Sequence, residues 1–315
     1  MKIAAVMALC EGELAIAVDA AASLNDACPG DEVCWYLVDD KSPSKVGQRL
    51  AEFLRARGFQ ARSVELAKRL GFRGCISRSF LGLRMVVESG FAADLVVKLD
   101  PDSLFVRQDL QTFLATHCWQ KDGAWGLVST MHMRNRVLLL ADLLPMGFRR
   151  RLGKDGTLER NWELARMGSV WWADIGYKAM FQGFRFRYFG GPCYILGGQT
   201  VLKLAQAGFL NRVQEDRHGF LTSEEDVLMT LAVTAVGTAI TDLREIHPRW
   251  AEFQISPRTT LDKLAADQPF LVHPLKASPA GDALRERVRS AFGLKSRLLV
   301  EANSGGALTE EVQRT

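Results

Sequence analysis

Short apolar runs alternate with amphipathic stretches along the first hundred residues. Four of the runs have the length and the β-branched or aromatic content of buried strands: residues 2–9, 33–38, 59–66 and 94–99. Three stretches between them have the apolar spacing or the alanine-rich composition of helices: residues 14–24, 46–57 and 79–89. Gly58 is a typical C-terminal stop for the second of these helices. Strands that alternate with helices predict βαβ units, a largely parallel sheet and hence an α/β fold.

The pattern is less regular beyond residue 105. Tryptophans and glycines are frequent in residues 119–198, and a clear helical pattern returns at residues 221–236. A basic amphipathic stretch begins after residue 280, and we expect the polar end, residues 303–315, to lack fixed structure.

Composition restricts the function more than it identifies it. The chain has 315 residues, of which 48% are hydrophobic and 24% charged, as in an ordinary globular protein. A net charge of +4 is too small to argue for nucleic acid, but it suits a small anionic substrate. Neither a GxGxxG nor a GxxxxGK[ST] motif follows a strand, which weakens the dinucleotide and P-loop interpretations.

The six cysteines and the apolar runs favour a cytoplasmic enzyme. No CxxC pair is present, so we expect free thiols in a reducing compartment rather than a zinc site. Residues 2–9 imitate a signal peptide but are too short and are followed by acidic residues, so we interpret them as a strand. No run approaches the roughly 20 apolar residues that span a bilayer.

Two carboxylates directly follow the fourth predicted strand, in the sequence Asp100-Pro101-Asp102. Side chains alternate along an extended chain, so Asp100 and Asp102 point to the same side. Ligands of parallel sheets bind beyond the carboxyl ends of the strands, where this pair lies. Two hard oxygen ligands there suit Mg²⁺ or Mn²⁺ shared with a diphosphate. Alternatively, the pair forms an acidic turn that bonds local backbone.

A second acidic pair begins the helix predicted at residues 221–236. Thr222 with Glu225, or Ser223 with Asp226, fits a capping box. Adjacent helical residues point about 100° apart, so capping explains only one of the two carboxylates. If Glu225 closes the box, Asp226 is left to face a cleft. We therefore expect Asp226 to be catalytic, with Glu225 as the alternative.

Two further segments carry possible site residues. His273 follows a short apolar strand, and Lys276 lies three residues on, so they could supply a metal ligand and a phosphate contact. A histidine in such a place is otherwise a hydrogen-bonded structural residue. The pairs Gly190-Gly191 and Gly197-Gly198 flank a short strand, where they either let backbone approach a ligand or form ordinary turns.

In their order along the chain, the aspartate pair, the glycine-flanked strand, the acidic helix start and the late histidine resemble the GT-A glycosyltransferases, and most closely the fringe and β-1,3-galactosyltransferase-like group. That group usually carries a third acidic residue before the DxD, where this chain has Leu99. The resemblance implies a Rossmann-like nucleotide-sugar-binding half, residues 1–105, fused to an acceptor-binding and catalytic half, residues 106–280, around a mixed central sheet. The basic amphipathic helix and tail would then occupy residues 281–315.

The resemblance further implies an inverting, Mn²⁺- or Mg²⁺-dependent hexosyltransferase. It would move sugar from a UDP-sugar to a hydroxyl of a glycan or glycolipid, as in polysaccharide biosynthesis. Asp102 would bind the metal directly with His273 as second ligand, Asp100 would bind ribose or metal-bound water, and Asp226 would be the base. Other residues would contact the nucleotide or line the donor and acceptor pocket: Ala8, Asp39, Arg84 and Lys276 for the nucleotide, and Gly190, Gly191, Gly197, Gly198 and Trp172 for the pocket.

Three other functions remain open from the sequence. The first is a retaining GT-A transferase, in which Asp226 only positions substrate. The second is a sugar-phosphate nucleotidyltransferase, against which the acidic segment Glu11-Gly12-Glu13 follows the first strand. The third is a degenerate transferase that acts as a binding protein, against which the acids are intact.

A peripheral membrane contact is a separate hypothesis about the basic stretch near the end of the chain. Apolar residues there recur at helical spacing among five basic ones: Arg285, Arg287, Arg289, Lys295 and Arg297. Such a helix can lie in an anionic interface, with residues 137–151 as a second contact. Alternatively, it docks on its own domain through its apolar face.

Overall fold

Seven strands form a mixed central sheet in the order β3-β2-β1-β4-β7-β6-β8. The computed structural model of the chain describes residues 1–118, 120–143, 172–212, 225–252 and 261–294. The strands are β1 (Lys2–Leu9), β2 (Glu32–Asp39), β3 (Gln60–Glu65), β4 (Leu95–Leu99), β6 (Ala124–Thr130), β7 (Arg187–Gly197) and β8 (Ile240–Asp242). Only β7 runs antiparallel to its neighbours, β4 and β6. The predicted α/β class and mixed central sheet are confirmed.

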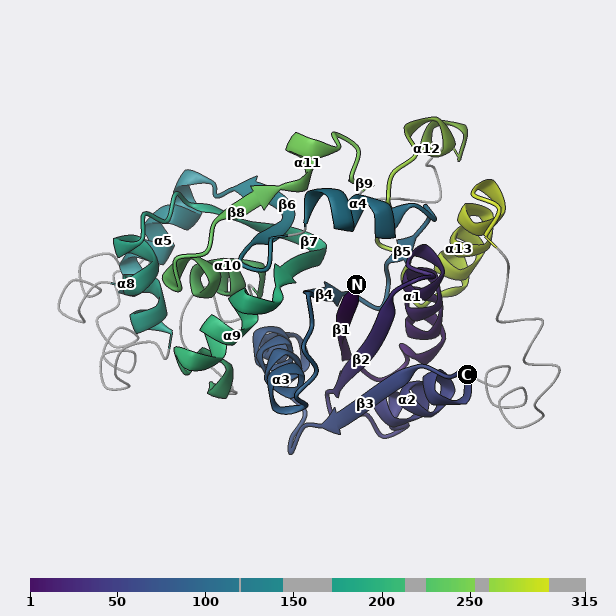
Figure 1. Cartoon of the computed structure of the whole chain (residues 1–315), viewed down its shortest axis with the longest axis horizontal. Helices are drawn as coiled ribbons and strands as arrows, with labels where there is room; N and C mark the ends of the chain where they lie inside the picture. Colours follow the sequence, from purple (N-terminus) through teal and green to yellow (C-terminus); the bar gives the residue numbers. More distant parts are fainter. Residues whose placement is uncertain (119, 144–171, 213–224, 253–260, 295–315) are drawn as a thin grey trace, which may run out of the picture.

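Helices cover both faces of this sheet (Figure 1). One face packs against α1 (Leu14–Ala27), α2 (Val46–Ala56) and α4 (Leu110–His117). The other packs against α3 (Cys75–Glu88), α8 (Ala173–Phe181), α9 (Gly198–Gln206) and α10 (Glu225–Ala235). In β1, Ala5 and Met7 enter the first core, and Ala4 and Val6 enter the second. A strand buried on both faces reads as a continuous apolar run, which is how it was predicted.

A second, three-stranded sheet brings distant segments together. It consists of β5 (Leu104–Phe105), β10 (Leu271–Val272) and β9 (Ala251–Glu252), with β10 in the middle. Since β5 follows Asp102 closely and β10 directly precedes His273, their antiparallel pairing places these two residues at one site.

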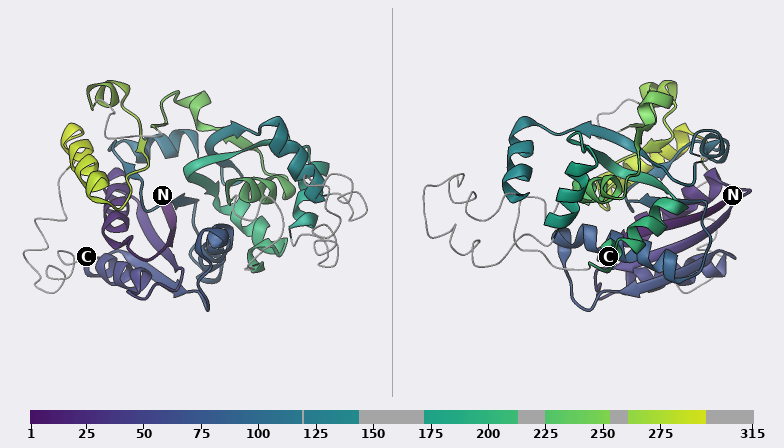
Figure 2. Two further views of the ribbon diagram at one scale, coloured as in Figure 1. Left: turned by 180° about the vertical axis from the view of Figure 1, so that it is seen from behind. Right: turned by 60° about the vertical axis from the view of Figure 1, so that its left-hand side comes forward.

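The basic amphipathic stretch is α13 (Pro279–Ala291), which docks on the protein itself. Leu284 and Val288 pack with Leu104 and Val272 in a small third core. Figures 1 and 2 show α13 lying beside α1. The remaining described helices are η1 (Gly71–Gly74), α5 (Met133–Leu143), η2 (Phe209–Asn211), α11 (Leu243–Ile246) and α12 (Leu261–Asp267).

This docking corrects the predicted membrane helix in part. Arg285 and Arg289 are only 3% and 5% exposed, so they cannot contact a lipid surface. Lys295, Arg297 and residues 144–151 lie outside the described residues. Among the helices that the structure describes, none has the length and apolar content to cross a membrane.

The predicted elements agree with the structure apart from their ends. The third helix begins at Cys75 rather than at residue 79, and α10 is described from Glu225 onward. All six cysteines lie in the described part of the chain and are free thiols. The central sheet continues across residue 105, so the division into two halves at that point stays a prediction. The polar end, residues 303–315, lies outside the described residues.

Candidate functional site

Asp100, Asp102 and His273 form a cluster at the carboxyl end of β4. Each can offer one ligand atom such that these atoms all lie within 4.8 Å of one another. Nε2 of His273 lies 3.1 Å from Oδ1 of Asp102. Asp102 is buried, whereas Asp100 and His273 are half-buried, so the cluster is partly accessible to solvent. The structure thus brings together the three residues that the sequence proposed as metal ligands.

The carboxyl group of Asp102 is ionised at neutral pH. Burial alone would raise its pKa, but hydrogen bonds from His273 and Lys276 outweigh this and hold the pKa below its usual range. Lys276 forms an ion pair with Oδ2 of Asp102 while its side chain stays largely exposed. An ionised, preoriented carboxylate is what a divalent cation requires.

The donor set fits Mn²⁺ or Mg²⁺. Two carboxylates supply hard oxygen ligands, and the imidazole of His273 suits Mn²⁺ better than Mg²⁺. Three protein ligands leave the other coordination positions to water or substrate. The cluster can therefore hold a cation that also contacts a bound phosphate.

A buried lysine connects this cluster to the second acidic pair. Nζ of Lys98 lies 2.7 Å from Oδ1 of Asp100 and 3.2 Å from Oε1 of Glu225. The hydroxyls of Ser79 and Tyr194 donate to the same oxygen of Glu225, at 2.6 and 3.0 Å. One polar network beside the Asp100–Asp102–His273 cluster therefore joins four elements: β4, β7, α3 and α10.

We expect Lys98→Met to destabilise the protein by about 3 kcal/mol, because it leaves the half-buried carboxylates of Asp100 and Glu225 without their buried cation. Burial would lower the pKa of Lys98, but Asp100 and Glu225 raise it well above its usual value. Lys203→Met is the matched control, since Lys203 also pairs with an aspartate, Asp122, but is 38% exposed. That control should lose less than about 1 kcal/mol. Urea unfolding gives the free energy of unfolding of each variant. A loss in Lys98→Met as small as that in the control would show that the Lys98 network is not stabilising.

Glu225 belongs to this network, and its predicted role in a helix cap stays a prediction. Its carboxylate accepts hydrogen bonds from Ser79 and Tyr194, and it contacts Lys98. The proposed cap partners, Thr222 and Ser223, lie outside the described residues.

Asp226 is half-buried and makes interactions of its own. Its charge is close enough to Lys98 to help raise the lysine's pKa. Both members of the acidic pair therefore lie near the Asp100–Asp102–His273 cluster.

Three residues of this network, Lys98, Ser79 and Tyr194, were not predicted from the sequence. Ser79 and Tyr194 carry no local pattern that points to Glu225. Lys98 did carry one, because a lysine inside the apolar strand at residues 94–99 requires buried carboxylate partners.

The predicted nucleotide contacts are only partly at this edge of the sheet. Ala8 lies near the end of β1 and is partly exposed. Asp39 is buried, and its two carboxylate oxygens accept hydrogen bonds from Ser42 and Gly47. These bonds close the loop between β2 and α2, and the predicted contact of Asp39 with the nucleotide stays a prediction. Arg84 pairs with Glu88 at 3.4 Å on α3.

A second buried ion pair at this edge was not predicted. Nη1 of Arg78 lies 3.0 Å from Oδ2 of Asp40, and the carboxylate of Asp40 also accepts from the backbone of Leu70 and Gly71. These contacts fix the chain that leads into α3 beside the ends of β1 and β2.

The two glycine pairs do not flank a short strand as predicted: Gly190 and Gly191 lie inside β7, and Gly197 is its last residue. Gly190 and Gly191 precede Pro192, whose carbonyl accepts from the backbone N–H of Asp100 at 2.8 Å, so this pair lies at the site end. Gly197 instead pairs with Leu95, at the start of β4, which is the far end.

The second glycine pair serves internal packing, which corrects its assignment to the pocket. A Cβ on Gly197 would lie 2.2 Å from the carbonyl oxygen of Lys121, and one on Gly198 would lie 2.0 Å from that of Ala93. Trp172, also predicted to line the pocket, is fully buried in the core against α8 and α10. All three residues are packed inside the protein.

The sequence matches no protein-family model and no curated protein. Among solved structures, the galactosyltransferase LgtC, in complex with donor and acceptor sugar analogs, is 14% identical, with a TM-score of 0.46 over 96% of this chain and 99% of that one. The WbbM bifunctional glycosyltransferase is 13% identical, with a TM-score of 0.44, and the match covers 86% of this chain and 45% of that one. TarS of S. aureus, residues 1–349 in complex with UDP-GlcNAc, is 16% identical, with a TM-score of 0.31 over 42% and 35%. Since all three TM-scores are below 0.5, the functional account depends on the residues of this chain.

Proposed function

We propose that this chain is a metal-dependent glycosyltransferase of the GT-A type, which moves a sugar from a nucleoside diphosphate to a hydroxyl acceptor. The observation that carries the proposal is the Asp100–Asp102–His273 cluster at the carboxyl end of a central strand, beside a second acidic pair. The resemblance of the sequence motifs to the fringe and β-1,3-galactosyltransferase-like group favours a UDP-sugar donor and a glycan or glycolipid acceptor.

The residues of the cluster would bind the cation and the diphosphate. Asp102 and His273 would hold Mn²⁺ or Mg²⁺ directly, and Asp100 would complete the site as a third ligand or by bonding ribose or metal-bound water. When bound, the cation acts as a Lewis acid that stabilises the diphosphate leaving group. Lys276 pairs with Asp102 here, but its side chain is 69% exposed. It would turn toward a phosphate once the negative charge of Asp102 is neutralised.

Asp226 would be the base that accepts the proton of the acceptor hydroxyl. One oxygen of Glu225 already has three partners, which suits a residue that orients its neighbours. Asp226 lies in the first turn of α10, where the helix dipole favours its ionised form. A base that acts opposite the leaving group inverts the anomeric carbon. The reaction would pass through an oxocarbenium-like state, as in glycoside hydrolysis.

Removal of metal tests this function. We expect EDTA to abolish cleavage and transfer of a UDP-sugar chosen from a panel, because the diphosphate leaving group then loses its charge stabilisation. Added Mn²⁺ or Mg²⁺ should restore the rate. Chromatography measures product formation. All samples have the same ionic strength, so that a change in the screening of charges does not alter the rate. An undiminished rate in EDTA would exclude a metal-dependent transferase.

A further inference from the structure

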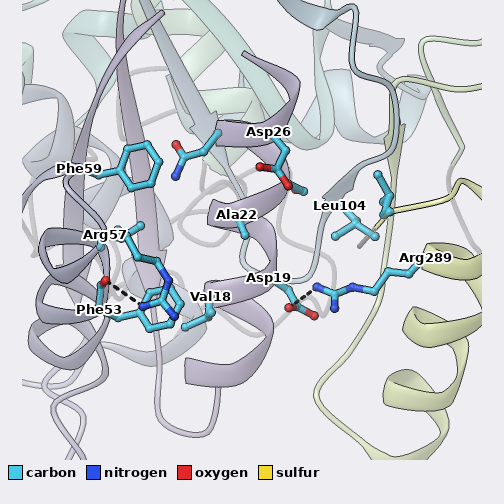
Figure 3. Close-up of a pocket in the computed structure, with 13 residues that line it drawn as sticks. Val18, Asp19, Ala22, Asp26, Phe53, Arg57, Phe59, Leu104 and Arg289 are labelled. Carbon is cyan, nitrogen blue, oxygen red and sulfur yellow. Dashed lines mark hydrogen bonds and ion pairs between the residues drawn. The ribbon is translucent and has the colours of Figure 1, made fainter. Parts of the chain in front are cut away.

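Buried charges join the last described helix to the first. Asp19 of α1 contacts both Arg285 and Arg289 of α13: the Arg285 pair is 3.5 Å long, and Arg289 donates a hydrogen bond to the other oxygen of Asp19. All three side chains are at least nine-tenths buried. Figure 3 shows Arg289 reaching across to Asp19 at the edge of the cavity between α1 and α2.

A gain in stability does not by itself explain the buried group of Asp19, Arg285 and Arg289. Burial raises the pKa of Asp19 to about 6, although Arg289 and Arg285 both act to lower it. Burial also lowers the pKa of Arg285. Removing three charges from water costs free energy that buried ion pairs often fail to recover. A role in fixing geometry is therefore the better explanation.

Two hydrogen bonds in series link Arg285 to the Asp100–Asp102–His273 cluster. Its Nη2 donates to the carbonyl oxygen of Leu275 at 2.6 Å. The backbone N–H of Leu275 donates in turn to the carbonyl oxygen of Asp102 at 2.7 Å. Leu275 lies between His273 and Lys276, the two residues that contact the carboxylate of Asp102.

The first turn of α13 also packs closely against residues 273–276. A Cβ built on Gly281 would lie 1.9 Å from the carbonyl oxygen of Lys276, and that neighbour is backbone and cannot rotate away. Glycine is therefore required at this contact. Leu275 itself is fully buried and packs with Leu284 and Val288 of α13.

We infer that α13 sets the position of residues 273–276 relative to Asp102, with Arg285 as the positioning residue and Asp19 as the group that orients it. Arg285 contacts no substrate. It acts through the backbone of Leu275 on the metal ligand His273 and on Lys276. This inference rests on the proposed function only in that the cluster binds a divalent cation.

The test compares Arg285→Met with Arg287→Met, an exposed arginine on the same helix. We expect Arg285→Met to weaken Mn²⁺ binding by about 10–100-fold, as loss of a residue behind a metal ligand typically does. Arg287→Met should bind Mn²⁺ like the unmodified chain. Arg285→Lys should recover part of the affinity, since an ammonium can still reach the Leu275 carbonyl. Electron paramagnetic resonance of free Mn²⁺ gives the affinity.

Hydrogen exchange separates this inference from the function. The amide of Leu275 should exchange faster in Arg285→Met than in Arg287→Met, whether or not Mn²⁺ binds. If the unmodified chain binds no Mn²⁺, the proposed function fails while the exchange comparison still tests the role of α13. Unchanged exchange in a folded Arg285→Met variant would overturn the inference. If that variant does not fold, Gly281→Ala replaces it, because it displaces the same segment without touching the charges. Its unchanged exchange would be equally decisive.

Discussion

Asp102→Asn is expected to reduce metal-dependent cleavage of a nucleotide-sugar by about 10²–10⁴-fold, the equivalent of several kcal/mol of lost leaving-group stabilisation. Asp102 is the most buried of the three proposed ligands, and His273 and Lys276 keep it ionised. An amide binds Mn²⁺ poorly and cannot neutralise it. Steady-state rates at saturating Mn²⁺ measure the loss.

The fold should survive this substitution. Lys276 is largely exposed, so water can solvate it once its partner is lost. Asp109→Asn is the control, because Asp109 also pairs with a basic side chain, Arg107, but on the surface. A fully active Asp102→Asn variant would mean that the cluster is an acidic turn rather than a metal site.

Asp226→Asn is expected to lower kcat by about 10²–10⁴-fold with little change in affinity for the nucleotide or Mn²⁺. The amide keeps the shape of the side chain but cannot accept the proton of the acceptor hydroxyl. Rates of transfer, measured with acceptor present, report this step.

Glu225→Gln is the matched comparison at the adjacent position. It weakens the network around Lys98, so its main effect should be a loss of stability seen in urea unfolding. If the Glu225 variant is folded but inactive while Asp226→Asn is active, the two roles are reversed. If neither affects transfer, the acidic pair is not catalytic.

The first four strands and the aspartate pair could be predicted from local pattern alone. A strand buried on both faces leaves a continuous apolar run, and a carboxylate pair after β4 lies at the edge where parallel strands present ligands. The approach of His273 to Asp102 could not be predicted in this way. It depends on the pairing of β5 with β10, which joins segments far apart in the chain.

The errors arose where one pattern has two physical causes. A glycine pair has the same appearance whether backbone packs against a ligand or, as at Gly197, against the protein itself. Arginines of an amphipathic helix are normally solvated. Arg285 and Arg289, however, are turned inward because Asp19 lies opposite them on α1. The partner, and not the helix pattern, decides the burial of such residues.

The central claim is that Asp100, Asp102 and His273 form a metal site that holds a nucleoside diphosphate. A Mn²⁺ titration followed by electron paramagnetic resonance, with and without UDP, tests it most directly. The account predicts one Mn²⁺ site per chain that UDP tightens and that Asp102→Asn removes. Absence of Mn²⁺ binding in the presence of UDP, or equal binding by the Asp102→Asn variant, would contradict it.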